Sequence, residues 1–154
     1  LFVTRSDGGA YEARLPLAGD EAFAALNWKK LQTRVPDRNA LVAFNSRSTG
    51  GASAHLLAEL NVHEARPLGS AMKFCLIAAA EGDLYARFGE TCEWDTAAGQ
   101  AILEAAGGSV TTLDGKPLTY GHFARGFRNP HFVAWGRQPL WRSGDEASPN
   151  ARGA

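Results

Sequence analysis

The sequence predicts a mixed α/β sandwich, and three observations support this fold class. Short apolar strand patterns alternate with helical patterns over most of the chain, as they do in layered α/β domains. Several of the connections between them are short, so the sheet is expected to combine parallel and antiparallel strands. The 154 residues, 45% hydrophobic and 21% charged, are sufficient for one sizeable core.

The first forty residues have the weakest pattern. Residues 1–15 predict two short strands around the turn Asp7-Gly8-Gly9. Residues 21–26 show a short helical pattern, and residues 28–35 alternate as an exposed strand does. Residues 36–39 predict a turn, and we place the start of the compact domain there.

Strands and helices alternate regularly after this turn. A buried strand is predicted at 41–44, and further strands are predicted at 64–68, 83–88, 109–113 and 132–135. Helices are predicted at 52–60, 70–80 and 96–106. Residues 144–154 are rich in Ser, Pro, Gly and Asn without periodicity, which predicts a disordered tail.

Composition and charge narrow the classes of function. Sixteen basic and sixteen acidic residues give a formal net charge of zero, so we expect no nucleic-acid polymer as a partner, and anion binding must be local. No apolar run is long enough to span a membrane, and no signal peptide is recognisable. Two cysteines, Cys75 and Cys92, suit a reducing cytoplasm. The histidines have no zinc-ligand spacing, and no nucleophile elbow, dinucleotide or P-loop motif occurs.

Asp95 is the first candidate site residue. It precedes the helix predicted at 96–106, which Gly107-Gly108 is expected to end in a left-handed conformation. At the N-cap, its carboxylate would accept backbone N–H bonds. A simple cap is the plainest interpretation, but the same position also suits a phosphate or a cation paired with a phosphate.

Three further segments offer groups that bind anions. Ser70 and Lys73, three residues apart, would gather a hydroxyl and an ammonium at the start of the helix predicted at 70–80; a Ser cap beside a solvated Lys is the alternative. Arg87 ends a predicted strand, where its guanidinium could grip a phosphate or simply lie exposed. Residues 45–51, which include Arg47 and Ser48, have the composition of a phosphate-binding loop; the alternative is that Ser48 or Thr49 merely caps the next helix. Trp94 is expected in the core and Glu93 in a solvated loop.

The segment Trp-Asp-Thr-Ala-Ala-Gly at 94–99, followed by Ala-Gly-Gly at 106–108, resembles a family signature. It is similar to the C-terminal motif of the metal-dependent, lithium-sensitive phosphatases that include inositol monophosphatase, fructose bisphosphatase and the bisphosphate nucleotidases. The likeness extends through residues 69–76 and 83–89, which most resemble the 3′(2′),5′-bisphosphate nucleotidase branch. It covers about residues 41–135.

The resemblance implies the C-terminal domain of the inositol monophosphatase and fructose bisphosphatase fold. Residues 1–37 would be a remnant of the N-terminal domain, and residues 38–143 the C-terminal α/β domain. The family's Glu-Glu pair and Asp-Pro-x-Asp-Gly-Thr segment do not occur in the sequence, which starts without Met inside a strand pattern. We therefore expect the N-terminal catalytic half to be missing.

The same resemblance implies roles for the candidate residues. Asp95 would be a catalytic residue and a ligand of Mg²⁺. Substrate binding would fall to Gly69, Ser70, Lys73 and Arg87 and to the loop with Arg47 and Ser48. The substrate would be adenosine 3′,5′-bisphosphate, hydrolysed to AMP and phosphate in sulfur assimilation.

Two alternatives stay open. One is an inositol or fructose phosphate phosphatase of the same fold. The other is a non-catalytic fragment that binds an anion or a partner domain, because one carboxylate cannot hold a hard dication against its hydration. An apolar face exposed by a missing half would favour a homo-oligomer.

Overall fold

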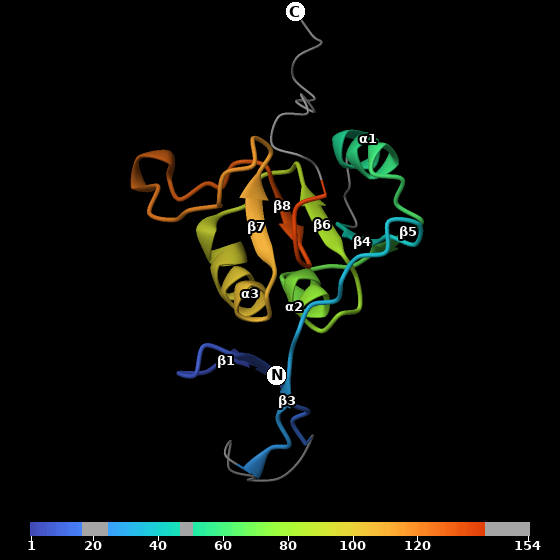
Figure 1. Ribbon diagram of the computed structural model, residues 1–154. Coiled ribbons are helices and arrows are strands. Elements are labelled where there is room, and N and C mark those ends of the chain that lie inside the picture. The colour runs from blue at the N-terminus through green and yellow to red at the C-terminus, as the bar shows by residue number, and fades with distance from the viewer. Residues whose placement is uncertain (17–24, 47–50, 141–154) are drawn as a thin grey trace, which may run out of the picture.

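The computed structural model describes residues 1–16, 25–46 and 51–140. Within these ranges the chain forms a three-stranded sheet, a five-stranded sheet and three α-helices (Figure 1). None of the described helices is long and apolar enough to cross a membrane. The mixed α/β class predicted from the sequence is confirmed.

The small sheet contains the predicted hairpin. Strand β1 (Phe2–Thr4) pairs antiparallel with β2 (Ala10–Glu12), and β2 pairs antiparallel with β3 (Lys29–Lys30). Gly8 lies in the turn with φ of +77°, a conformation that glycine adopts without a Cβ penalty. The hairpin prediction is therefore confirmed.

The strand predicted at 28–35 is wrong beyond its first residues. Only Lys29–Lys30 pairs with β2, because the chain then leaves the small sheet for the main domain. The Thr33 amide donates to the Ala106 carbonyl at 3.0 Å, and the Arg34 guanidinium binds the buried Asp83 carboxylate. These long-range bonds replace the ladder that the alternating pattern predicted.

The large sheet has the strand order β5-β4-β6-β8-β7. β4 is parallel to both β5 and β6, whereas β8 is antiparallel to both β6 and β7. The prediction of a mixed sheet is thus confirmed, with small shifts of the strand ends. The five strands are β4 (Val42–Asn45), β5 (Glu64–Pro67), β6 (Leu84–Arg87), β7 (Ser109–Thr112) and β8 (Phe132–Trp135).

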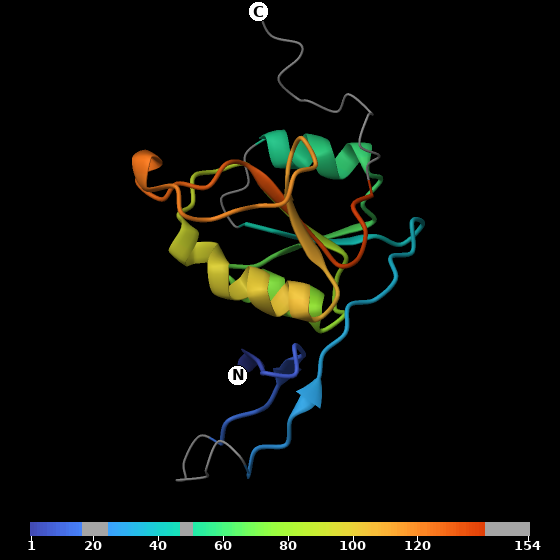
Figure 2. The same ribbon diagram turned by 60° about the vertical axis from the view of Figure 1, so that its left-hand side comes forward.

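The helices cover both faces of the large sheet. α1 (Gly51–Glu59) lies on one face, and α2 (Met72–Ala78) and α3 (Glu93–Ala105) lie side by side on the other (Figures 1 and 2). The small sheet packs on the outer side of α2 and α3, where Ala10 and Leu31 join their hydrophobic core. The described part of the chain is therefore a stack of helix, sheet, helix pair and sheet.

Aromatic rings fill the layer between the large sheet and the helix pair. Phe74 of α2 contacts Tyr85 edge to face at 5.6 Å, and Tyr85 contacts Phe132 in the same way at 5.7 Å. Gly99 lets α3 approach Phe74 closely, because a Cβ there would lie 2.7 Å from the Phe74 ring. This contact fixes the spacing between the two helices.

The predicted division of the chain is only partly covered by the structure. The segment 144–154 and most of the helical pattern at 21–26 lie outside the described residues. The boundary at residues 37/38 stays a prediction.

Candidate functional site

The candidate site is a cavity of about 440 Å³ at the carboxyl ends of β4 and β6. The two strands are parallel neighbours, but α1 follows β4 on one face and α3 follows β6 on the other. Diverging connections of this kind open a crevice that α/β proteins commonly use for ligands. The first turns of α2 and α3 form its walls, and Ser70, Lys73, Arg87, Trp94 and Asp95 are among its lining residues.

Asp95 is not the N-cap that the sequence predicted. α3 begins at Glu93, so Asp95 is its third residue and Cys92, in an extended conformation, is the N-cap. The Cys92 amide donates to Asp95 Oδ2 at 2.8 Å, which anchors the carboxylate in the first turn. The helix end is as predicted, because Gly107 adopts φ of +94°.

The start of α2 also differs from the prediction. The helix begins at Met72, and Ser70 lies before it with φ of +65°, so Ser70 does not cap it. Lys73 is buried with 3% of its surface exposed, which contradicts the solvated alternative. Its Nζ donates to the Ser70 carbonyl at 2.8 Å and the Leu68 carbonyl at 3.1 Å, and it lies 4.5 Å from the centre of the Tyr85 ring. Three neighbouring groups therefore stabilise a buried ammonium.

Burial has a cost for this ammonium. It lowers the pKa of Lys73 to about 8, with a smaller contribution from the positive charge of Arg87. A negatively charged ligand in the cavity would favour the protonated form. Binding of an anion in the cavity would therefore raise the pKa of Lys73.

Arg87, the last residue of β6, also lines the cavity. Its Nη1 donates to Ser46 Oγ at 2.9 Å and its Nη2 donates to the Glu90 carbonyl at 3.1 Å. The buried Nε has no hydrogen-bond partner among the described residues. Nη1 and Nη2 each keep one N–H donor for an incoming oxygen ligand, whereas the buried Nε is out of its reach.

Two residues next to Asp95 behave differently from their predictions. Trp94, expected in the core, is 69% exposed beside the cavity, with its ring 6.2 Å from that of Phe127. Trp94 and Asp95 are both exposed in the first turn of α3, and Thr96 is the first buried residue of this helix. Glu93, expected in a solvated loop, accepts the amides of Gly121 and His122 and pairs with His122 Nδ1 at 2.9 Å.

A polar network behind the cavity escaped the sequence analysis. Asn129 Nδ2 donates to Thr91 Oγ1 at 3.2 Å and to Thr96 Oγ1 at 3.0 Å. The Tyr120 hydroxyl bonds to Thr96 Oγ1 at 3.3 Å and to Gln100 Oε1 at 2.7 Å. These partners are 20 to 38 residues apart, so no local pattern announces them.

The other predicted residues are not brought into the cavity by the described structure. Gly69 precedes Ser70 but does not line the cavity. Arg47 and Ser48 lie outside the described residues. Their neighbour Ser46 does line it, through its contact with Arg87. The functional roles of all these residues stay predictions.

The acidic groups of the site are few. In the described ranges, no group of three or more His, Cys, Asp or Glu side chains is placed to hold a metal ion. Glu90 lines the cavity but pairs with Arg128 at 2.8 Å. Asp95 keeps Oδ1 outside its bond to Cys92, so it could provide one oxygen ligand to a hard cation.

Comparison with known proteins identifies the class to which this fold and site belong. Residues 11–136 match the inositol monophosphatase family, so the chain belongs to that family. It is 42% identical over 102 residues to the 3′(2′),5′-bisphosphate nucleotidase CysQ of Escherichia coli K12, covering 66% of this chain and 41% of the relative. It is also 51% identical over 84 residues to an uncharacterized protein of the pss 5′ region of Rhizobium leguminosarum bv. phaseoli, covering 52% of this chain and 88% of that protein.

Solved structures show the same relationship. The crystal structure of CysQ from Bacteroides thetaiotaomicron, a bacterial member of the inositol monophosphatase family, matches with a TM-score of 0.67 and 30% sequence identity. The match covers 85% of this chain and 51% of that structure. The chain thus spans about half the length of this neighbour and less than half of the Escherichia coli nucleotidase. The fold predicted by the resemblance is confirmed.

Proposed function

We propose that this chain is the substrate-binding part of a Mg²⁺-dependent phosphatase that hydrolyses adenosine 3′,5′-bisphosphate to AMP and phosphate. The observation that carries the proposal is the convergence of Lys73, Arg87 and Asp95 on one cavity. The named relative with 42% identity is a 3′(2′),5′-bisphosphate nucleotidase, which supports this substrate class. The free thiols Cys75 and Cys92 suit a reaction in the cytoplasm.

Lys73 and Arg87 would bind the phosphate groups. The Arg87 guanidinium is planar and always charged, so it would bind phosphate oxygens with charge-assisted hydrogen bonds through the Nη1 and Nη2 donors that its bonds to Ser46 and Glu90 leave over. The Lys73 ammonium has three N–H donors, and two of them already bind carbonyls. The remaining donor would contact the substrate, and the two bonds to carbonyls would orient the ammonium for this contact.

Asp95 would hold Mg²⁺ through one carboxylate oxygen, supported by its bond to Cys92. When bound, Mg²⁺ lowers the pKa of a coordinated water and neutralises charge on the phosphoryl group. Since the described residues offer no further cluster of ligands, the remaining ones would come from another part of the whole protein. The isolated chain is accordingly expected to bind substrate but not to turn it over.

Trp94 would distinguish a nucleotide from a smaller phosphate ester. Its exposed indole lies beside a cavity lined by two cations, and a flat aromatic surface can stack on a nucleobase. An inositol or fructose phosphate has no aromatic ring to stack. The family name nonetheless favours inositol phosphate as the second candidate substrate.

Phosphate release measured with Mg²⁺ tests this proposal. The 154-residue chain would be compared with a longer protein that contains it and supplies the remaining ligands, using adenosine 3′,5′-bisphosphate, inositol phosphate and fructose bisphosphate. We expect lithium-sensitive activity on the nucleotide in the longer protein only. Preference for inositol phosphate would overturn the substrate assignment, and inactivity on all three would favour a role in binding only.

A Trp94→Ala variant of the longer protein separates the two substrate classes. Loss of stacking should raise KM for the nucleotide about tenfold or more and leave inositol phosphate unaffected. Phe88→Ala is unsuitable as a control because Phe88 packs against the core, so exposed Phe123→Ala is the matched aromatic control. Equal effects of Trp94→Ala on both substrates would contradict a base-stacking role.

A further inference from the structure

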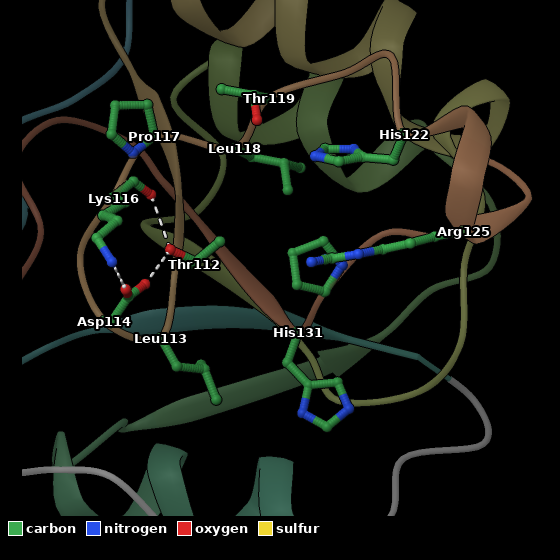
Figure 3. A pocket seen from close by; sticks show the side chains of 11 residues that line it. Thr112, Leu113, Asp114, Lys116, Pro117, Leu118, Thr119, His122, Arg125 and His131 are labelled. Atoms are coloured by element: carbon green, nitrogen blue, oxygen red, sulfur yellow. Dashed lines mark hydrogen bonds and ion pairs between the residues drawn. The ribbon is translucent and has the colours of Figure 1, made fainter.

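A second cavity lies on another side of the domain. Its volume is about 630 Å³, and it lies between the segment after β7, the 3₁₀ helix η2 (Phe123–Arg125) and the residues before β8. It shares no lining residue with the candidate site. Its polar lining includes Thr112, Asp114, Lys116, His122, Arg125 and His131 (Figure 3).

The one carboxylate among its lining residues is already paired. Asp114 contacts Lys116 Nζ at 2.6 Å and also accepts a hydrogen bond from Thr112. These bonds, that of Lys116 first, lower the pKa of Asp114 to about 2. Asp114 and Lys116 therefore cancel, and the remaining ionisable groups of the lining are basic.

Arg125 supplies an uncompensated positive charge. Its side chain extends between His122 and His131 into the cavity (Figure 3). No hydrogen bond or ion pair joins the Arg125 guanidinium to any side chain within residues 1–16, 25–46 and 51–140. A guanidinium with an open fork, flanked by two imidazoles, is suited to bind an oxyanion bidentately.

The wall that holds these groups is fixed before any ligand arrives. Glu93 accepts both backbone amides of Gly121 and His122 and contacts His122 Nδ1, which leaves His122 Nε2 for the cavity. The Phe127 carbonyl accepts the Glu93 amide at 2.9 Å, so the loop is tied to α3 on both sides of η2. A prearranged loop loses little conformational entropy when a ligand binds.

We propose that this second cavity binds a small molecule that carries a phosphate or sulfate group. Arg125 and His131 contact the oxyanion. Leu113, Pro117 and Leu118 supply an apolar wall for an uncharged remainder of the ligand. This site is independent of the proposed phosphatase function, because the two cavities have no lining residue in common.

Residue-resolved NMR tests the proposal with inorganic phosphate as the probe. Amide signals of the 154-residue chain are followed during a phosphate titration and during a sodium chloride titration at equal ionic strength. We expect saturable shifts at Thr119, Gly121 and Arg125 with phosphate only. Shifts around Arg87 and Asp95 report the candidate site separately, so the failure of either site is visible without the other.

Two variants assign the binding. Arg125→Gln should weaken phosphate binding at the second cavity about tenfold, because the bidentate contact is lost. Arg137→Gln removes an exposed guanidinium outside the cavity and should leave binding unchanged. His131→Gln, a second exposed position, should weaken binding to a smaller extent. Equal affinity in Arg125→Gln and Arg137→Gln, or shifts that chloride reproduces, would overturn the proposal.

Discussion

Helices α2 and α3 present their first turns to the same cavity, but with opposite charges. α3 begins with Glu93 and Asp95, which the positive end of the helix dipole favours. α2 has the buried Lys73 in its first turn and no side-chain cap, and Ser70 ahead of it has a left-handed backbone. One helix start is stabilised by local rules, and the other violates them.

This difference shows that the start of α2 departs from the local conformational preferences of its residues. Left-handed non-glycine residues and buried charges persist only when their surroundings hold them in place. Lys73 is held by two carbonyls and the Tyr85 ring. The start of α2 is therefore the part of the cavity whose geometry is maintained against local preference, as expected for a site that binds a ligand.

The largest expected effect comes from the acidic first turn. In the longer protein that we propose to be active, Asp95→Asn should lower kcat by on the order of 10² to 10³, because the proposed metal ligand is lost. Its fold should be kept, since an amide oxygen can still accept the Cys92 N–H. Mg²⁺-dependent phosphate release and thermal unfolding measure the two effects. Glu59→Gln on α1 is the control, and an unchanged rate in Asp95→Asn would remove Asp95 from the mechanism.

The basic first turn should make stability depend on pH. The folded chain loses the Lys73 proton near pH 8, whereas the unfolded chain keeps it to about 10.5. Between these values the unfolded state binds more protons at Lys73, so Lys73 should raise the free energy of unfolding with pH by on the order of 3 kcal/mol, while the raised pKa values of Cys75, Tyr85 and Tyr120 act in the opposite direction. Lys73→Met should abolish this rise, and Lys30→Met, on the exposed β3, should retain it. Denaturant unfolding at several pH values decides, and a rise that survives in Lys73→Met would refute the assignment.

A third variant changes the packing of α3 against α2. Gly99→Ala would place a Cβ 2.7 Å from the Phe74 ring and push α3 from α2. We expect a loss of about 1–3 kcal/mol in the free energy of unfolding. Gly51→Ala, with no atom within 4 Å of the new Cβ, should cost nothing of this kind. Equal stability of the two variants would show that Gly99 does not set the helix spacing.

The smallest effect is expected for Glu93, the other carboxylate in the first turn of α3. Glu93→Gln weakens the tie to the loop at Gly121 and His122 and should cost about 1–2 kcal/mol. Hydrogen exchange should accelerate at these two amides, with little change in α2. If exchange accelerates in α2 as much as at Gly121 and His122, then Glu93 stabilises the whole domain and not the loop alone.

Local sequence signals predicted the elements whose stability is local. The hairpin at residues 1–15 follows from Asp7-Gly8-Gly9, and the end of α3 follows from Gly107. The alternation of strands and helices was also predicted, because each βαβ unit is formed by segments that follow one another in the sequence. The family signature at 94–99 pointed to the correct fold.

Side-chain environments could not be predicted in the same way. Lys73 was placed at the cavity by its spacing, but its burial depends on Tyr85 and the Leu68 carbonyl. Glu93 and His122 are 29 residues apart, and no periodic pattern connects them. Whether Asp95 is a cap or the third residue of its helix was decided by Cys92, which is not a usual N-cap residue.

The class of fold, the family and the candidate residues of the cavity could be predicted from the sequence alone. Backbone propensities and turn chemistry act over a few residues, so they can be recognised along the chain. The tertiary structure decided which of these groups are buried, charged or exposed, as with Lys73 and Trp94. Solvation and long-range hydrogen bonds depend on segments far apart in sequence, and folding alone brings those segments together.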